Sequence, residues 1–158
     1  MISTLVFGAV LFFATGDGCS HHGAQVDARH DTFGMSHDTS HHSFRLFADG
    51  GAIELRANDP KDDATTAVIR THLHHIAGAF ANRDFSAPMF VHGHPPDGID
   101  TMKRLHKRIS YRYEDVVSGG RIRIRTADPR ALAAVHDFMR FQVVEHRSGD
   151  SGQVEEDK

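Results

Sequence analysis

The sequence predicts an α+β domain built from two β-β-α units, with four antiparallel strands in one sheet and two long helices on one face of it. The main observation is an internal repeat: segment 50–60 begins with Gly-Gly and ends with Asp-Pro, and segment 119–129 has the same ends. Both copies alternate apolar and polar residues, as half-buried strands do. Each copy is followed by apolar residues at helical spacing. Two strands and a helix are therefore expected twice.

The strands of each unit are expected to form a hairpin. Alternating segments at 44–47 and 109–114 precede the Gly-Gly pairs, and the second strand of each hairpin follows them. In the first unit we expect Gly50 and Gly51 to form the tight turn, because glycine tolerates the positive φ that such turns need.

The two long helices are expected at 60–82 and 129–146. Asp59 and Asp128 are the expected N-caps, and Pro60 and Pro129 would occupy the first helical position, where the missing N–H costs nothing. Between the units lie an apolar segment at 87–92 and a short helical insert within 95–108, which interrupts the repeat.

Both flanks of the domain, which we place at 44–148, have a different composition. The apolar run at 1–15 is typical of an export signal, and the Gly-Cys pair at 18–19 resembles a bacterial lipobox, so segment 1–19 is expected to direct export and lipid attachment at Cys19. An uncleaved membrane anchor is the alternative. Segments 20–43 and 149–158 are polar and are expected to be disordered. Removing residues before Ser43 should then cost no stability.

Histidine is the unusual feature of the composition. The 158-residue chain has 14 histidines and a net charge of −3, so no nucleic-acid partner is expected, and metal, haem or proton chemistry is indicated. Segment 20–43 is expected to capture copper or zinc, since neutral imidazoles and a thioether suit these ions. A plain solvated linker is the alternative. The ligands expected there are His37, His41, His42 and Met35.

A second set of histidines lies in the domain itself. A helical wheel places His72 inward and His75 at the border of the first long helix, and His136 inward on the second. His72 and His75 are expected to approach His136 across the two helices, and His92 on the insert is expected to close this site, which would hold copper or zinc. Purely structural histidines are the alternative for each. Non-covalent haem or another small ligand remains a second possibility, and a histidine-dependent enzyme a third.

Several motifs carry a resemblance to a family of small, largely uncharacterised bacterial exported proteins. They are His41-His42-Ser43-Phe44, Ala57-Asn58-Asp59-Pro60, His72-Leu73-His74-His75-Ile76, Asp84-Phe85-Ser86-Ala87-Pro88, Val135-His136-Asp137-Phe138 and Glu145-His146-Arg147. The resemblance implies export but no established activity. Some members are labelled aspartate carbamoyltransferase. That label does not fit, because the carbamoyl-phosphate motif Ser-Thr-Arg-Thr is absent from the sequence.

The function expected from the sequence is therefore that of an exported metal-binding protein in the periplasm or on the outer surface of the cell envelope. It would buffer or deliver copper or zinc, and a lipid on Cys19 would hold it at the membrane.

Overall fold

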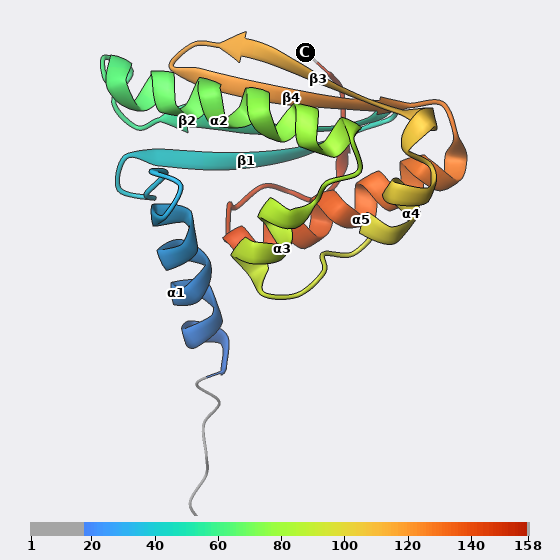
Figure 1. Cartoon of the computed structure of the whole chain (residues 1–158), viewed down its shortest axis with the longest axis horizontal. Coiled ribbons are helices and arrows are strands. Elements are labelled where there is room, and N and C mark those ends of the chain that lie inside the picture. Colours follow the sequence, from blue (N-terminus) through green and yellow to red (C-terminus); the bar gives the residue numbers. More distant parts are fainter. Residues whose placement is uncertain (1–17, 158) are drawn as a thin grey trace, which may run out of the picture.

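The structure, a computed structural model, describes the backbone of residues 18–157 and the side chains of residues 25–157. The predicted α+β class is confirmed (Figure 1). The elements in chain order are α1 (Gly18–Asp31), β1 (Ser40–Phe47), β2 (Gly50–Ala57), α2 (Asp63–Ala81), α3 (Ser86–His92), α4 (Ile99–Arg104), the 3-10 helix η1 (His106–Arg108), β3 (Ile109–Val116), β4 (Gly119–Thr126), α5 (Pro129–His146) and β5 (Val154–Glu155).

The sheet has the order β3-β4-β2-β1-β5. Strands β1 to β4 pair in an antiparallel manner, whereas β5 pairs with β1 in parallel. The sheet is thus mixed and has five strands, not the four antiparallel strands that the sequence predicts. The predicted disorder of 149–158 is wrong at β5, which is held to the edge by an ion pair between Arg45 and Glu155 at 2.9 Å. A strand of only two residues in a polar segment shows no alternation of apolar and polar residues, so the sequence does not predict β5.

The internal repeat appears as local two-fold symmetry in the centre of the sheet. Ile53 of β2 lies opposite Ile122 of β4, and these two residues are equivalent positions of the repeat. The first glycine of each copy lets the two strands approach closely enough to pair. A Cβ on Gly50 would lie 2.0 Å from the Ile124 carbonyl oxygen, and one on Gly119 would lie 2.0 Å from that of Leu55. The glycines therefore lie within the strands, and the turn predicted at Gly50 and Gly51 is formed by residues 48 and 49 instead.

The second long helix, α5, has the predicted bounds, and its cap is Asp128, whose carboxylate accepts from the N–H of Arg130 at 2.9 Å. Helix α2 begins later than predicted. Its cap is Asp62, which accepts both the N–H of Thr65 at 2.9 Å and the hydroxyl of the same residue at 2.6 Å. These two hydrogen bonds make Asp62 the cap in place of Asp59, which lies three residues earlier in a turn.

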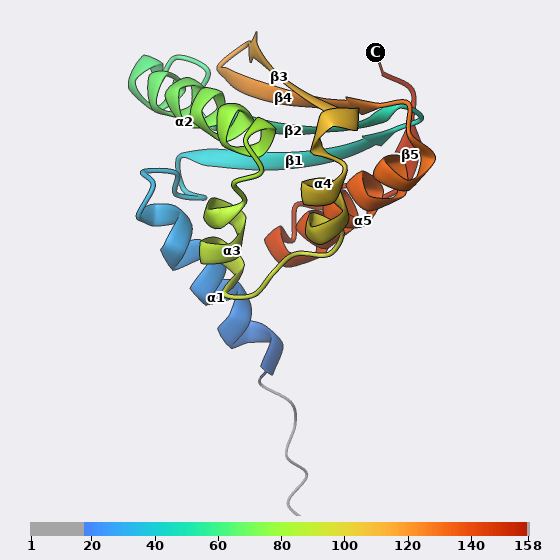
Figure 2. The same cartoon turned by 45° about the vertical axis from the view of Figure 1, so that its right-hand side comes forward.

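Both long helices cover the same face of the sheet, as predicted. Leu73 of α2 packs near Gly120 of β4, and Met139 of α5 packs near Gly51 of β2. The insert forms α3, α4 and η1, and α4 packs along α5 (Figure 2). Among residues 18–157, no helix is both long enough and apolar enough to cross a bilayer.

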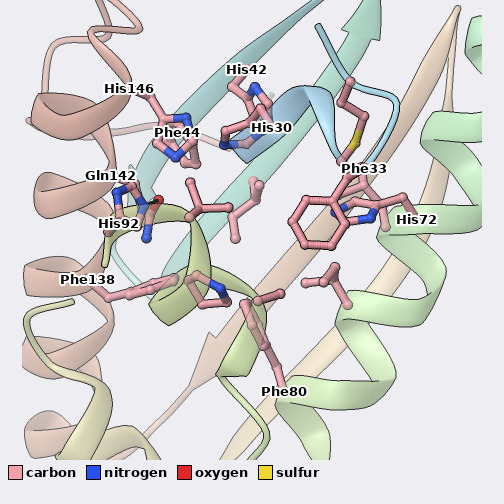
Figure 3. A pocket seen from close by; sticks show the side chains of 17 residues that line it. His30, Phe33, His42, Phe44, His72, Phe80, His92, Phe138, Gln142 and His146 are labelled. Atoms are coloured by element: carbon pink, nitrogen blue, oxygen red, sulfur yellow. Dashed lines mark hydrogen bonds between the residues drawn. The ribbon is translucent and has the colours of Figure 1, made fainter. Parts of the chain in front are cut away.

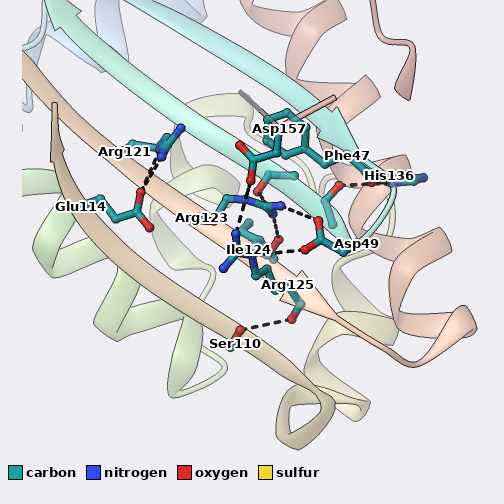
Figure 4. Close-up of polar contacts among 12 residues, drawn as sticks. Phe47, Asp49, Ser110, Glu114, Arg121, Arg123, Ile124, Arg125, His136 and Asp157 are labelled. Carbon is teal, nitrogen blue, oxygen red and sulfur yellow. Dashed lines mark hydrogen bonds and ion pairs between the residues drawn. The ribbon is translucent and has the colours of Figure 1, made fainter. Parts of the chain in front are cut away.

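The other face of the sheet is rich in arginine. The central side chain is Arg123, only 1% exposed, which lies over the Phe47 ring at 4.5 Å and pairs with Asp49 and, at 2.9 Å, with Asp157 (Figure 4). Its Nη1 also donates to the Gly51 carbonyl at 3.1 Å. The segment after α5 is thereby fastened across this face.

The segment before β1 is ordered, so the predicted disorder of 20–43 is wrong. Val26 and His30 lie one helical turn apart on α1 and are both buried. Arg29 donates to the carbonyl oxygen of Phe90 in α3 at 2.8 Å, and Met35 after the helix is 1% exposed. The segment gains its buried surface from α3 and α5. The export signal predicted at 1–17 lies outside the described residues, as does the side chain of Cys19, whose backbone begins α1.

Candidate metal centre

Three histidines from distant parts of the chain meet where α1, β1 and the end of α5 come together. They are His30 of α1, His42 of β1 and His146 at the end of α5, and one ring nitrogen from each lies within 4.8 Å of the other two (Figure 3). Their ring centroids are 4.6 Å apart for His30 and His42, 4.7 Å for His30 and His146, and 4.9 Å for His42 and His146. No other group of three or more potential ligands of this kind is found among the described residues.

Local structure explains why these side chains converge. Successive residues of β1 point to opposite faces, which turns His42 with Phe44 toward the helices and His41 away from them. Helix α5 ends at His146, where the left-handed Arg147 (φ 50°) closes the helix. Just beyond it, the Asp150 carboxylate accepts the N–H of Phe44 at 2.8 Å, which fixes the end of α5 against β1.

His30 and His146 are buried and His42 is half-buried, and several of their ring nitrogens lack hydrogen bonds that would compensate for the loss of water. His30 is 5% exposed and His146 is 8% exposed. Both nitrogens of His30 and the Nδ1 atoms of His42 and His146 have no hydrogen-bond partner among the described residues. Each unsatisfied polar group costs about 1–3 kcal/mol. Several such atoms close to one another form a group that could hold a metal ion.

Burial also keeps these imidazoles neutral. It lowers the pKa of His30 to about 3, with a smaller contribution from His37, and it holds the pKa values of His42 and His146 well below 6.5, with further lowering from neighbouring histidines. The neutral imidazole is the form that binds a metal. At pH 7 all three side chains are therefore ready as ligands.

A cavity of about 70 Å³ adjoins the three histidines. Its other walls are mainly apolar, and the described residues that line it include no carboxylate, hydroxyl or thiol. Further lining residues are Phe33, Met35, Phe44, Ile53, His72, Leu73, Ile76, Phe80, Ala87, Pro88, Val91, His92, Phe138 and Gln142.

Five of the residues proposed from the sequence lie in or beside this site. His42 belongs to the cluster, and Met35 lines the cavity. His92 also lines the cavity, with its ring 5.0 Å from that of His146, whereas His72 lies against Phe33 at 5.6 Å. Burial, with a smaller contribution from His75, lowers the pKa of His72 to about 4. The ring of His37 lies 6.1 Å from that of His42, and its Nε2 is 3.5 Å from an Asp27 carboxylate oxygen.

The other three proposed ligands lie elsewhere, so the predicted convergence of His72, His75 and His136 is wrong. His136 Nε2 donates to the Phe47 carbonyl at 2.9 Å and lies 3.1 Å from the Gly50 carbonyl, at the β1–β2 turn. His75 is exposed on α2. His41 is exposed on the opposite face of β1, where its Nδ1 lies 2.9 Å from Asn58 Oδ1.

Two members of the cluster, His30 and His146, were not selected as ligands from the sequence. His146 continues the inward stripe of α5, and this is the one signal that points to it. His30 lies four residues after Val26, and a single apolar residue at that spacing does not mark a buried helix face.

Known proteins give no information on this group of histidines. No family model, no curated protein and no solved structure matches the chain.

Proposed function

We propose that the protein binds one zinc or copper ion through His30, His42 and His146. The observation that carries this proposal is the convergence of three neutral imidazoles, two buried and one half-buried, of whose six ring nitrogens four are buried without a hydrogen-bond partner among the described residues. A bound ion would compensate for the cost of burying these nitrogens.

The spacing of the three nitrogens is close to what an ion needs. Ligands about 2.05 Å from a tetrahedral zinc lie about 3.3 Å from one another. The nitrogens are at most 4.8 Å apart, so the widest pair has to approach by at most about 1.5 Å. We expect rotation of the rings about their side-chain torsions to bring about this change.

The ligand types favour zinc and copper over harder ions. Imidazole suits zinc and copper, while calcium and magnesium prefer oxygen ligands. Met35 lines the same cavity, and its thioether is a suitable additional ligand for Cu(I).

Haem is a poorer candidate. The cavity of about 70 Å³ is much smaller than the roughly 300–1,000 Å³ of typical small-molecule sites, and haem is a large ligand. The site is thus proposed for an ion with, at most, a very small additional ligand.

We also propose that the metal site belongs to an exported protein of the cell envelope, where it buffers or delivers its ion. The support is the apolar run at 1–15, followed by the Gly-Cys pair at 18–19. Since α1 begins at Gly18, cleavage before Cys19 would leave the helix that carries His30 nearly whole. Mass spectrometry of the protein from a bacterial host tests this proposal: a chain that keeps Met1 and carries no lipid would contradict it.

The metal site is tested by titrating the full chain with Zn(II) or Cu(I) in competition with a chromophoric chelator. One ion per chain is expected at the cluster. Removal of a residue that hydrogen-bonds a metal ligand weakens metal binding by roughly 10–100-fold. Loss of a direct ligand in H30A, H42A or H146A should therefore weaken binding by about 100-fold or more.

Matched controls separate the cluster from other histidines. H74A and H75A remove exposed imidazoles of α2 and should leave the tight site unchanged. A double variant, H21A/H22A, measures weak capture by histidines near the start of the chain. Equal losses in the control and cluster variants would contradict the proposal, as would a wild-type chain that binds neither ion.

A further inference from the structure

The cavity beside the three histidines has features that a metal ion alone does not use. In Figure 3, His30, His42 and His146 lie together on one side, and Phe80 and Phe138 lie on the opposite side. Three ligands on one wall leave a coordination position of a tetrahedral ion open toward the cavity, because a closed site needs four protein ligands.

An unused hydrogen-bond donor lies in this cavity. Gln142 is one helical turn before His146 on α5 and is 3% exposed. Its Oε1 is 3.0 Å from His92 Nε2 and, as a carbonyl oxygen, accepts the proton of that nitrogen. The amide is thereby oriented, and its Nε2 has no hydrogen-bond partner among the described residues. Buried amide groups normally have one.

The charge of the site selects the kind of ligand that fits. A divalent ion bound by three neutral imidazoles keeps its two positive charges, and no carboxylate is found among the described residues that line the cavity. An uncompensated charge is costly in such apolar surroundings. An anion at the open position reduces this cost.

The volume limits the size of that anion. A cavity needs a volume of roughly 10–15 Å³ to hold one water molecule. The cavity of about 70 Å³ therefore accommodates about five non-hydrogen atoms. The apolar walls favour an alkyl group over a second polar group.

We propose that the open position binds a short-chain monocarboxylate of the size of acetate or propionate. One carboxylate oxygen binds the metal, the other accepts a hydrogen bond from Gln142 Nε2, and the alkyl group packs among the apolar side chains of the cavity. This inference rests on the proposed metal site and names the small ligand that completes it.

Cobalt(II) is the probe, because it takes zinc sites and its visible absorption changes with the ligands around it. The full chain is first loaded with cobalt and then titrated with acetate, propionate, hexanoate and chloride. Acetate and propionate should change the spectrum at lower concentrations than chloride does. Hexanoate, which has eight non-hydrogen atoms, should bind at least about tenfold more weakly than propionate because it exceeds the cavity.

Two substitutions test the amide. Q142L and Q142M remove the donor at similar side-chain volume, and they should weaken propionate binding by about tenfold or more while cobalt still loads. Q153L, at an exposed glutamine, is the matched control and should bind propionate as the wild type does.

The outcomes separate the two proposals. If the chain binds neither cobalt nor Cu(I), both the metal site and its carboxylate ligand are refuted. If it binds Cu(I) but no cobalt, the inference fails and the metal site stands. If cobalt loads and the carboxylates leave its spectrum unchanged, or hexanoate binds as tightly as propionate, the inference fails and the metal site stands. Unchanged propionate affinity in both Gln142 variants would refute the role of the amide. The comparison of ligands on the wild type decides the case even if a variant does not fold.

Discussion

Acid is expected to destabilise the metal-free protein, because four buried or half-buried histidines are neutral when it is folded. Burial lowers the pKa of His30 to about 3 and that of His72 to about 4, and it holds those of His42 and His146 well below 6.5. Unfolding returns each imidazole to water, where it takes up a proton below pH 6.5. The free energy of unfolding therefore has its full value above pH 6.5 and falls as the pH drops toward the folded pKa values.

The size of the effect follows from the proton linkage. His30 and His72 each lose about 0.8 kcal/mol of stabilisation at pH 6 and about 2 kcal/mol at pH 5. Together these two remove about 1.7 kcal/mol at pH 6 and about 4 kcal/mol at pH 5, against a total stability of roughly 5–15 kcal/mol for a domain. The lowered pKa values of His42 and His146 act in the same direction and add to this loss.

Urea denaturation with chelator present, followed by circular dichroism at pH 7.5, 6 and 5, measures this loss. H30L removes one of the titrating groups and should reduce the loss at pH 5 by about 2 kcal/mol, whereas H75L removes an exposed imidazole and should not change it. A free energy of unfolding that is the same at pH 7.5 and pH 5 would refute the reasoning, and so would an unaltered pH dependence in H30L.

Three further predictions concern the fold. A chain that starts at Ser43 lacks the buried Val26 and Met35 and should lose about 3–6 kcal/mol of stability, contrary to the expectation from composition; thermal unfolding decides between the two. H136A loses its hydrogen bond to a backbone carbonyl at the β1–β2 turn, so it should cost about 1 kcal/mol in denaturation while zinc affinity stays unchanged. G98A should cost at least about 2 kcal/mol, because φ of Gly98 is +79° and the new Cβ would lie 2.1 Å from a carbonyl oxygen of α5. G78A, where the new Cβ would have nothing within 4 Å, should instead stabilise α2 by about 0.5–1 kcal/mol. The melting temperatures of the two variants test this contrast.

The parts of the fold that depend on local sequence signals could be predicted. Asp128 and Pro129 mark the start of α5 in the chain itself, and the equivalence of Ile53 and Ile122 follows from the repeat. The positions of α1 and β5 could not, because each is a short polar segment that becomes ordered only through contact with distant elements.

The candidate site was predicted in part for a similar reason. A helical wheel gives the direction of a side chain and omits its position along the axis. His136 and His146 both point inward from α5, yet ten residues at 1.5 Å each separate them by about 15 Å along the helix. His136 therefore reaches the β1–β2 turn, while His146 reaches His42. His30 joins them only because α1 packs beneath the sheet. No local sequence pattern predicts this packing.

The wide separation of the three histidines along the chain bears on the order of assembly. His42 lies 12 positions after His30 in the chain, and His146 lies 104 positions after His42. A nascent chain that has not yet packed α5 against β1 offers two of the three imidazoles at most, so tight chelation has to follow completion of the tertiary structure. An ion at the proposed site would close both loops and tie α1 to the end of α5, so that it would oppose unfolding until it dissociates. Retained metal would then report a completely folded molecule.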